Sequence, residues 1–293
     1  MSNRSDGSDD RIDAATLRVW GLPDPGRTKQ SRGDAVIVGA SRRTPGAVIL
    51  AFEAAMRVGV GRVALLVPGS VEGQLGALLP EAAVHALPDD PDDPISGAAA
   101  DAVERADAVL VGPGFDDVPQ TRATLDAVLD LRPRRLVLDA YALAALPDIA
   151  RDRLPRDLVL TPNEREVEVL SGSSPDGDAF IPTLAEVARR YGAIVASYGV
   201  VAAPGGRILH VEGGGPELAT AGSGDVLAGA ITGFLARRID ADRAAAWGLW
   251  AHARAGGRLA ERFGLGILAR EFAAELALAV HEVDRGGKEG SSR

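Results

Sequence analysis

The sequence predicts an α/β domain of three layers, in which a mainly parallel central sheet is covered by helices on both faces. Two observations predict this class. Short, fully apolar segments alternate with longer segments whose apolar residues have helical spacing, and fully apolar strands are typical of a sheet buried on both faces. Polar or glycine-rich residues, among them Asp139 and Asn163, also recur directly after the strands, at the edge where open α/β sheets bind their ligands.

The expected elements follow this alternation in order. The first strand is apolar up to Gly39, the helix after it stops at Gly59, and the second strand is closed by Pro68. A hairpin strand is expected after the turn at residues 204–206. The predicted strands are residues 34–38, 62–67, 108–111, 135–138, 157–160, 194–196 and 207–211, and the predicted helices are residues 46–58, 121–131 and 184–191.

A single folded domain is predicted over residues 31–284. Residues 1–30 are polar and acidic and contain Pro23 and Pro25, so we expect a disordered leader. Residues 285–293 have the composition of a flexible tail. No repeat or internal linker interrupts the segment between them.

Composition excludes several classes of function. The chain of 293 residues has a net charge of −9 and no basic stripe with interleaved aromatic residues, so nucleic acid is not an expected partner. The absence of cysteine excludes disulfides, thiolate nucleophiles and cysteine metal sites. No apolar stretch approaches the roughly 18 residues of a membrane helix, and the first 30 residues contain no apolar signal core. We therefore expect a cytoplasmic protein with no membrane partner. A homo-oligomer is also expected.

Residues 218–235 contain the strongest candidate for chemistry. Gly222, Ser223 and Gly224 lead directly into an amphipathic helix, so several backbone N–H groups converge where the helix N-terminus adds roughly half a positive charge. This arrangement suits a nucleotide phosphate. Asp225, on the first turn, is then predicted to accept a proton from an attacking hydroxyl. The alternative is that Ser223 is an N-cap and Asp225 only complements the helix dipole.

Two further loops follow predicted strands. Residues 39–47 carry Arg42 and Arg43 and form either a substrate or phosphate loop, or an ordinary connection with solvated arginines. Gly112-Pro113-Gly114 brings the backbone close to a ligand or to a neighbouring helix, and the sequence leaves both open.

Asn163 and Glu166 are three residues apart and share one face of a helical turn. Such a pair can hold a hydrated Mg²⁺ near phosphates, or it can form an N-terminal capping box without any ligand. The four histidines lack metal-binding spacing, and His252, on a predicted helix with Trp247 and Trp250, is interpreted as a packing or interface residue.

Taken in chain order, these motifs resemble the ADP-dependent NAD(P)H-hydrate dehydratases, a carbohydrate-kinase-like family of the ribokinase-like fold. The resemblance runs from about Gly33 to Val280 and rests on residues 219–229 together with the upstream motifs at residues 112–114, 138–140 and 160–162. It implies a ribokinase-like three-layer α/β/α fold. Such enzymes repair NADH or NADPH hydrated at carbon 6 of the nicotinamide ring: they phosphorylate the hydroxyl with ADP or ATP and then lose phosphate.

The resemblance also implies roles for individual residues. Asp225 would bind the substrate and be the base on its hydroxyl, while Gly222, Ser223 and Gly224 would hold the transferring phosphate of the nucleotide. The implied substrate contacts besides Asp225 are Ala47, Gly114 and Asn163.

Three positions depart from the family pattern. Tyr141 replaces an aspartate, Asn163 replaces a histidine although Glu166 remains, and residues 194–199 lack a lysine. The chain's two lysines lie near its ends, so Arg43 is the candidate phosphate contact, with Mg²⁺ held near Asn163 and Glu166. Because Asn-x-x-Glu is closer to the true kinases of this fold, a small-molecule kinase stands as one alternative. The lost lysine and the altered acid favour a second alternative, a nucleotide-binding protein without turnover.

Overall fold

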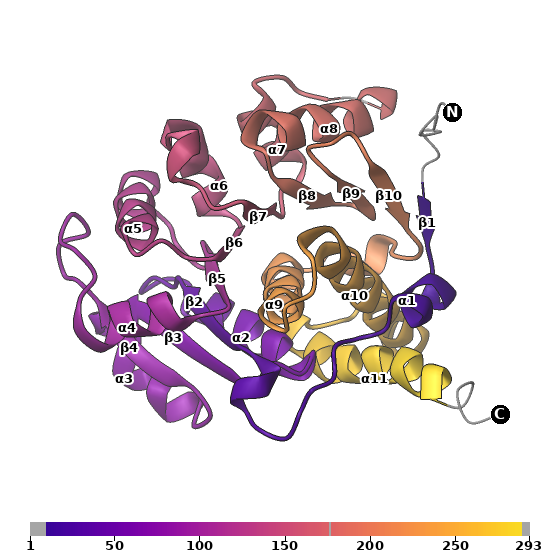
Figure 1. Ribbon diagram of the computed structural model, residues 1–293, viewed down its shortest axis with the longest axis horizontal. Helices are drawn as coiled ribbons and strands as arrows, with labels where there is room; N and C mark the ends of the chain where they lie inside the picture. Colours follow the sequence, from indigo (N-terminus) through magenta and orange to yellow (C-terminus); the bar gives the residue numbers. More distant parts are fainter. Residues whose placement is uncertain (1–9, 176, 289–293) are drawn as a thin grey trace, which may run out of the picture.

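The computed structural model describes residues 10–175 and 177–288. The strands within these ranges are β1 (Asp10–Ile12), β2 (Asp34–Val38), β3 (Arg62–Pro68), β4 (Ala83–Leu87), β5 (Ala108–Val111), β6 (Arg135–Leu138), β7 (Asp157–Leu160), β8 (Ile194–Ser197), β9 (Val200–Ala202) and β10 (Ile208–Val211). They form one sheet in the order β1-β10-β9-β8-β7-β6-β5-β2-β3-β4 (Figure 1). Neighbouring strands from β8 to β4 are parallel, whereas β9 is antiparallel to both β8 and β10. The predicted, mainly parallel sheet is confirmed.

Helices cover both faces of this sheet. They are α1 (Ala14–Trp20), α2 (Gly46–Arg57), α3 (Gly69–Leu78), α4 (Gly97–Arg105), α5 (Val118–Asp130), α6 (Tyr141–Ala145), α7 (Glu164–Ser171), α8 (Phe180–Tyr191), α9 (Ser223–Ala236), α10 (Ala241–Phe263) and α11 (Ala269–Lys288). Successive side chains of a strand point to opposite faces. Ile37 of β2 therefore packs into the core with α2, α9, α10 and α11, while Val38 packs into the core with α5 to α8. Figure 1 shows these two groups of helices on opposite faces of the sheet.

Helices α2 and α9 pack so closely that glycine is required between them. A Cβ at Gly233 would lie 2.9 Å from the carbonyl oxygen of Ala55. Near the other end of α9, a Cβ at Gly222 would lie 2.5 Å from Leu50 Cδ1. The two helices therefore run in the same direction, and their N-termini lie at the same edge of the sheet.

Residues 10–20 correct the predicted leader. Strand β1 pairs in parallel with β10, and Asp13 caps α1 by accepting a hydrogen bond of 2.7 Å from the Thr16 amide. Ile12 and Leu17 are fully buried against the core. The prediction of disorder over residues 1–30 is wrong for this segment, because two apolar side chains in a polar stretch suffice to extend the sheet edge. Residues 1–9 lie outside the described residues.

Other differences concern short or exposed elements. Strands β4 and β9 were not predicted, because β4 buries only Leu87 and β9 has three residues. Helix α11 continues to Lys288, past the predicted start of the tail at residue 285, and residues 289–293 lie outside the described part of the chain. Within the described ranges, no helix has both the length and the hydropathy to cross a bilayer.

Candidate functional site

The start of α9 presents unused backbone donors. Gly222 is the N-cap with a φ of 89°, a conformation that favours glycine. In the described chain, the amides of Gly224 and Asp225 have no hydrogen-bond acceptor, and a Cβ at Gly224 would meet no atom within 4 Å. Two unused N–H groups at a helix N-terminus, one of them on a glycine with open space beside it, are suited to binding an anion.

Ser223, in contrast, is used inside the protein. Its amide donates to the carbonyl oxygen of Thr220 at 3.1 Å, and its Oγ lies 2.9 Å from Nε2 of His252. The side chain is 5% exposed and makes no capping hydrogen bond, so the alternative of a Ser223 N-cap is wrong. Ser223 is part of the predicted phosphate loop, but its polar groups point into the fold.

Carboxyl groups from three elements meet beside this loop. Burial, and next the charge of Glu166, raise the pKa of Asp225 to about 6. Asp139, at the end of β6, is 6% exposed; burial raises its pKa well above the usual value, and the charges of Asp225 and Glu166 add to this effect. Thr161 Oγ1 donates a hydrogen bond of 2.7 Å to Asp139 Oδ1 and opposes the shift.

Asn163 and Glu166 form the capping box of α7. Asn163 Oδ1 accepts from the Glu166 amide at 3.1 Å, and Glu166 Oε2 accepts from the Asn163 amide at 2.8 Å. Burial raises the pKa of Glu166, while the hydrogen bonds from Asn163 lower it. The capping box is therefore present, and it leaves one Glu166 oxygen for another role.

A divalent cation fits this site only through water or phosphate. Among residues 10–175 and 177–288, no group of three or more His, Asp or Glu side chains is arranged to hold a metal directly. The charges of Asp225 and Glu166 nevertheless raise the pKa of Asp139, and the charge of Glu166 raises the pKa of Asp225. A nearby cation would relieve that repulsion.

The loops after β2 and β5 are joined to each other. Thr44 Oγ1 donates to the carbonyl oxygen of Gly114 at 2.6 Å, and the Ala40 amide donates to that of Pro113 at 2.7 Å. A Cβ at Gly114 would lie 2.5 Å from the Thr44 carbonyl oxygen and 3.0 Å from Ala47 Cβ. The close approach of Gly114 is thus to a neighbouring loop and to the start of α2, and it places Gly114 beside Ala47.

Arg42 and Arg43 lie on this β2–α2 loop and are both exposed. Neither guanidinium has a hydrogen bond or an ion pair with any residue that the structure describes. A cavity of about 200 Å³ lies beside the loop and is lined in part by Ser41, Ser70, Asp89, Phe115 and Asp116.

The structure brings most of the sequence-predicted residues into two neighbouring groups. Gly222, Gly224 and Asp225 lie with Glu166, and Ala47 lies with Gly114, while Leu50 connects the two groups through its approach to Gly222. Sequence reasoning singled out Asp139 only as the residue after a strand, although β6 and β7 are neighbours and their carboxyl ends had to meet. The contact of His252 with Ser223 left no signal in the sequence.

Comparison with known proteins places the chain in a family. Residues 35–277 match the model of the NAD(P)H-hydrate dehydratase family. An ADP-dependent (S)-NAD(P)H-hydrate dehydratase from Xanthomonas campestris is 40% identical over 94% of this chain and 97% of its own length. The chain belongs to the NAD(P)H-hydrate dehydratase family. The match runs from β2 to α11, and it confirms the family resemblance that the motifs indicated.

Bifunctional members of the family are longer than this chain. The bifunctional NAD(P)H-hydrate repair enzyme of Salinibacter ruber is 36% identical over 86% of this chain, which spans only 48% of that relative. The chain therefore spans about half the length of the bifunctional relatives that it matches.

Solved structures agree with the fold. A ribokinase-like superfamily protein from Enterococcus faecalis has a TM-score of 0.81 at 23% identity and covers 97% of this chain and 99% of its own. The ADP/ATP-dependent NAD(P)H-hydrate dehydratase of Bacillus subtilis, co-crystallised with ATP and Mg²⁺, has a TM-score of 0.77 at 23% identity and covers 94% and 99%. The fold of this family member is ribokinase-like, as predicted.

Proposed function

We propose that this protein dehydrates hydrated NADH or NADPH in a reaction driven by ADP or ATP. The observation that carries the proposal is the pairing, at the start of α9, of two unused amides with the Asp225 carboxyl, whose pKa is about 6. The two amides suit a phosphate, and the Asp225 carboxyl suits a hydroxyl group. The relative that shares 40% identity, named for this reaction, supports the assignment.

The reaction needs a phosphate because hydroxide is a poor leaving group. The carbon 6 hydroxyl oxygen attacks the terminal phosphorus of the nucleotide, the bond from that phosphorus to the shorter nucleotide breaks, and Asp225 takes the hydroxyl proton. The carbon–oxygen bond then breaks, phosphate leaves, and a proton is lost from the adjacent ring carbon to restore the double bond. At neutral pH a carboxyl group with a pKa of about 6 is mostly ionised and able to accept the first proton.

In this proposal the nucleotide and substrate approach from different elements. The amides of Gly224 and Asp225 hold the transferring phosphate, Gly222 provides the turn, and Ser223 fixes the loop from behind. The hydrated nicotinamide ring lies against Ala47 and Gly114, with Asn163 exposed at the start of α7 as a further contact.

Arg43 would supply positive charge for the leaving nucleotide, and a bound Mg²⁺ would add to it. Arg43 precedes α2, whose N-terminal end lies at the same edge as the start of α9, and its guanidinium has no protein partner among the described residues. A hydrated Mg²⁺ carried by the nucleotide phosphates would lie near Glu166 and Asn163, where the carboxyl groups repel one another.

The decisive experiment incubates the protein with hydrated NADH, Mg²⁺ and either ADP or ATP. We expect the absorbance of the dihydronicotinamide ring to return together with an equivalent amount of free phosphate. A stable phosphoester in place of dihydronicotinamide would identify a kinase. Nucleotide binding without either product would identify a protein without turnover, and an unchanged melting temperature at millimolar nucleotide would contradict all three assignments.

A further inference from the structure

Behind the phosphate loop lies a buried pair of polar side chains that the proposed reaction does not use. Nε2 of His252, on α10, lies 2.9 Å from Oγ of Ser223, and the two residues are 4% and 5% exposed. The imidazole ring stacks on Phe272 of α11, with a centroid distance of 4.9 Å and an interplanar angle of 19°. The histidine is thus fixed on one side by a ring and on the other by the loop.

This contact is one of two hydrogen bonds made by Ser223, the residue between the two glycines of the loop. The Ser223 amide is already bonded to the carbonyl oxygen of Thr220, so the hydrogen bond between Ser223 Oγ and His252 holds the same residue at a second point. Gly222 and Gly224 on either side have no side chains that could restrain the backbone. The direction of the Gly224 and Asp225 amides therefore depends on how Ser223 is held.

The histidine exerts this influence without a charge. Burial lowers the pKa of His252 to about 4, and a hydrogen bond with the Ser223 backbone opposes the shift only in part. Since the ring is neutral around pH 7, it does not attract phosphate electrostatically. Its contribution is to hold Ser223, and with it the loop, in place.

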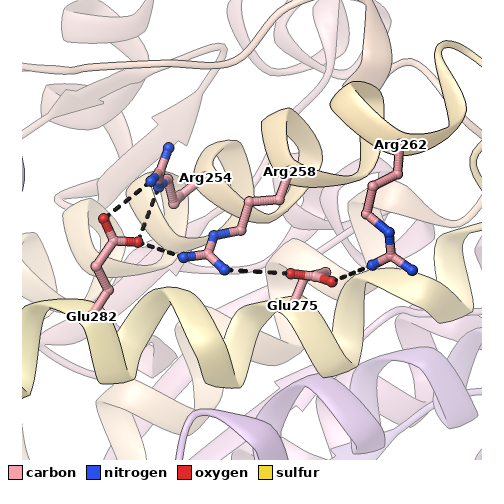
Figure 2. A network of polar contacts seen from close by, with 5 residues as sticks. All are labelled: Arg254, Arg258, Arg262, Glu275 and Glu282. Atoms are coloured by element: carbon pink, nitrogen blue, oxygen red, sulfur yellow. Dashed lines mark hydrogen bonds and ion pairs between the residues drawn. The ribbon is translucent and has the colours of Figure 1, made fainter.

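The two helices that carry His252 and Phe272 are themselves connected (Figure 2). Arg254, Arg258 and Arg262 lie on one face of α10 and contact Glu275 and Glu282 of α11. Glu275 is 7% exposed and lies 2.8 Å from Arg262, so this network is partly shielded from water. His252 therefore projects from a helix that α11 also holds in place.

We propose that His252 is a positioning residue for the nucleotide site: through its hydrogen bond to Ser223 it holds the start of α9 so that the amides of Gly224 and Asp225 face the phosphate. The proposal rests on the proposed function, because it concerns the binding of the same nucleotide.

The test compares ADP and ATP affinities of the parent chain, His252→Phe, Ser223→Ala and the double variant by calorimetry. Phenylalanine keeps a ring against Phe272 and removes the hydrogen bond. Each single variant should weaken binding by about tenfold, the size expected for one hydrogen bond. The double variant should be no weaker than the singles, because all three break the same contact. His252→Gln, which can still reach Ser223, should restore affinity to within about threefold of the parent.

Trp247→Phe is the matched control. Trp247 is buried on the same helix and contacts Phe234 of α9, and its indole N–H has no partner in the described part of the chain. It should lower the melting temperature and leave nucleotide affinity unchanged. Equal loss of affinity in Trp247→Phe and His252→Phe would overturn the proposal in favour of general helix packing, as would parent-like binding by Ser223→Ala. If His252→Phe does not fold, the nucleotide affinities of Ser223→Ala and Trp247→Phe are compared instead. A loss in Ser223→Ala alone supports the proposal. A parent chain that binds neither nucleotide contradicts the proposed function itself, and is seen before any variant is made.

Discussion

In the proposed reaction, one carboxyl group at the start of α9 has to lie beside a phosphate and still accept a proton. Burial and the neighbouring charge of Glu166 move the pKa of Asp225 to about 6, which leaves the group ionised at neutral pH and more basic than an exposed aspartate. Glu166 in turn is held by its capping hydrogen bonds to Asn163. Glu166, which with Asn163 stabilises the start of α7, therefore also affects the pKa of Asp225, the proposed base.

Asp225→Asn should lower turnover by about 10²- to 10⁴-fold, the usual effect of removing a general base. In the parent, activity should fall as the pH decreases through about 6, because the carboxyl becomes protonated, and the variant should lack this limb. A raised folded-state pKa contributes stability that is present in acid and lost as the pH rises through about 6, so at pH 7 the variant should melt no lower than the parent. The measurements are kcat against pH and thermal unfolding; turnover within a few-fold of the parent would remove Asp225 as the base.

A second prediction concerns Arg43, which is proposed to supply the positive charge of the lysine that residues 194–199 lack. Arg43→Ala should weaken ADP or ATP binding by roughly 1.5–3 kcal/mol, the range for a hydrogen bond to a charged group. Arg42→Ala is the matched control, because it removes the same charge from the adjacent position of the same exposed loop and should have a much smaller effect. Calorimetric titration measures both, and unchanged affinity in both variants of an active protein would show that the charge is supplied elsewhere.

At the scale of elements, the site is made from the ends of secondary structures. The close packing of α2 on α9 places two helix N-termini together, and β6 and β7 deliver Asp139 and the start of α7 to the same edge. The start of α9 contributes unused amides, the start of α7 contributes the N-cap Asn163, and the end of β6 contributes Asp139. The positions of the site residues therefore follow from where the elements stop.

Gly224→Val tests the opening at the start of α9. A Cβ at Gly224 would enter free space in the structure, and this is the space that a bound phosphate should occupy. The variant should fold but lose the rise in melting temperature that ADP or ATP produces in the parent. Gly257→Val is the control, since Gly257 is another helical glycine without neighbours within 4 Å, on α10, and carries the same cost of a branched side chain in a helix. A parent-like nucleotide shift in Gly224→Val would place the phosphate elsewhere.

At the scale of the whole molecule, the N-terminal segment is part of the domain. Leu17 on α1 is fully buried against the core that also contains α11, and β1 extends the sheet beyond β10. Leu17→Ala should therefore reduce the free energy of unfolding by about 2–5 kcal/mol, as for other buried leucines. Val19→Ala, two residues further along the same helix and 87% exposed, should change it by less than about 0.5 kcal/mol. Denaturant unfolding of the two variants compares them directly, and equal stability would restore the interpretation of a detached leader.

The sequence by itself determined the parallel α/β class, most central strands and helices, and the glycine loop with Asp225 at a helix start. These features are local, because apolar spacing, glycine positions and residues at strand ends act over a few neighbours. Only the tertiary structure decided the neighbour of Gly114, the burial of Leu17 and the contact of His252 with Ser223. Each of these depends on how separate elements pack against one another: the hydrogen bond from His252 joins residues 29 positions apart on two helices, and no spacing within either helix encodes it.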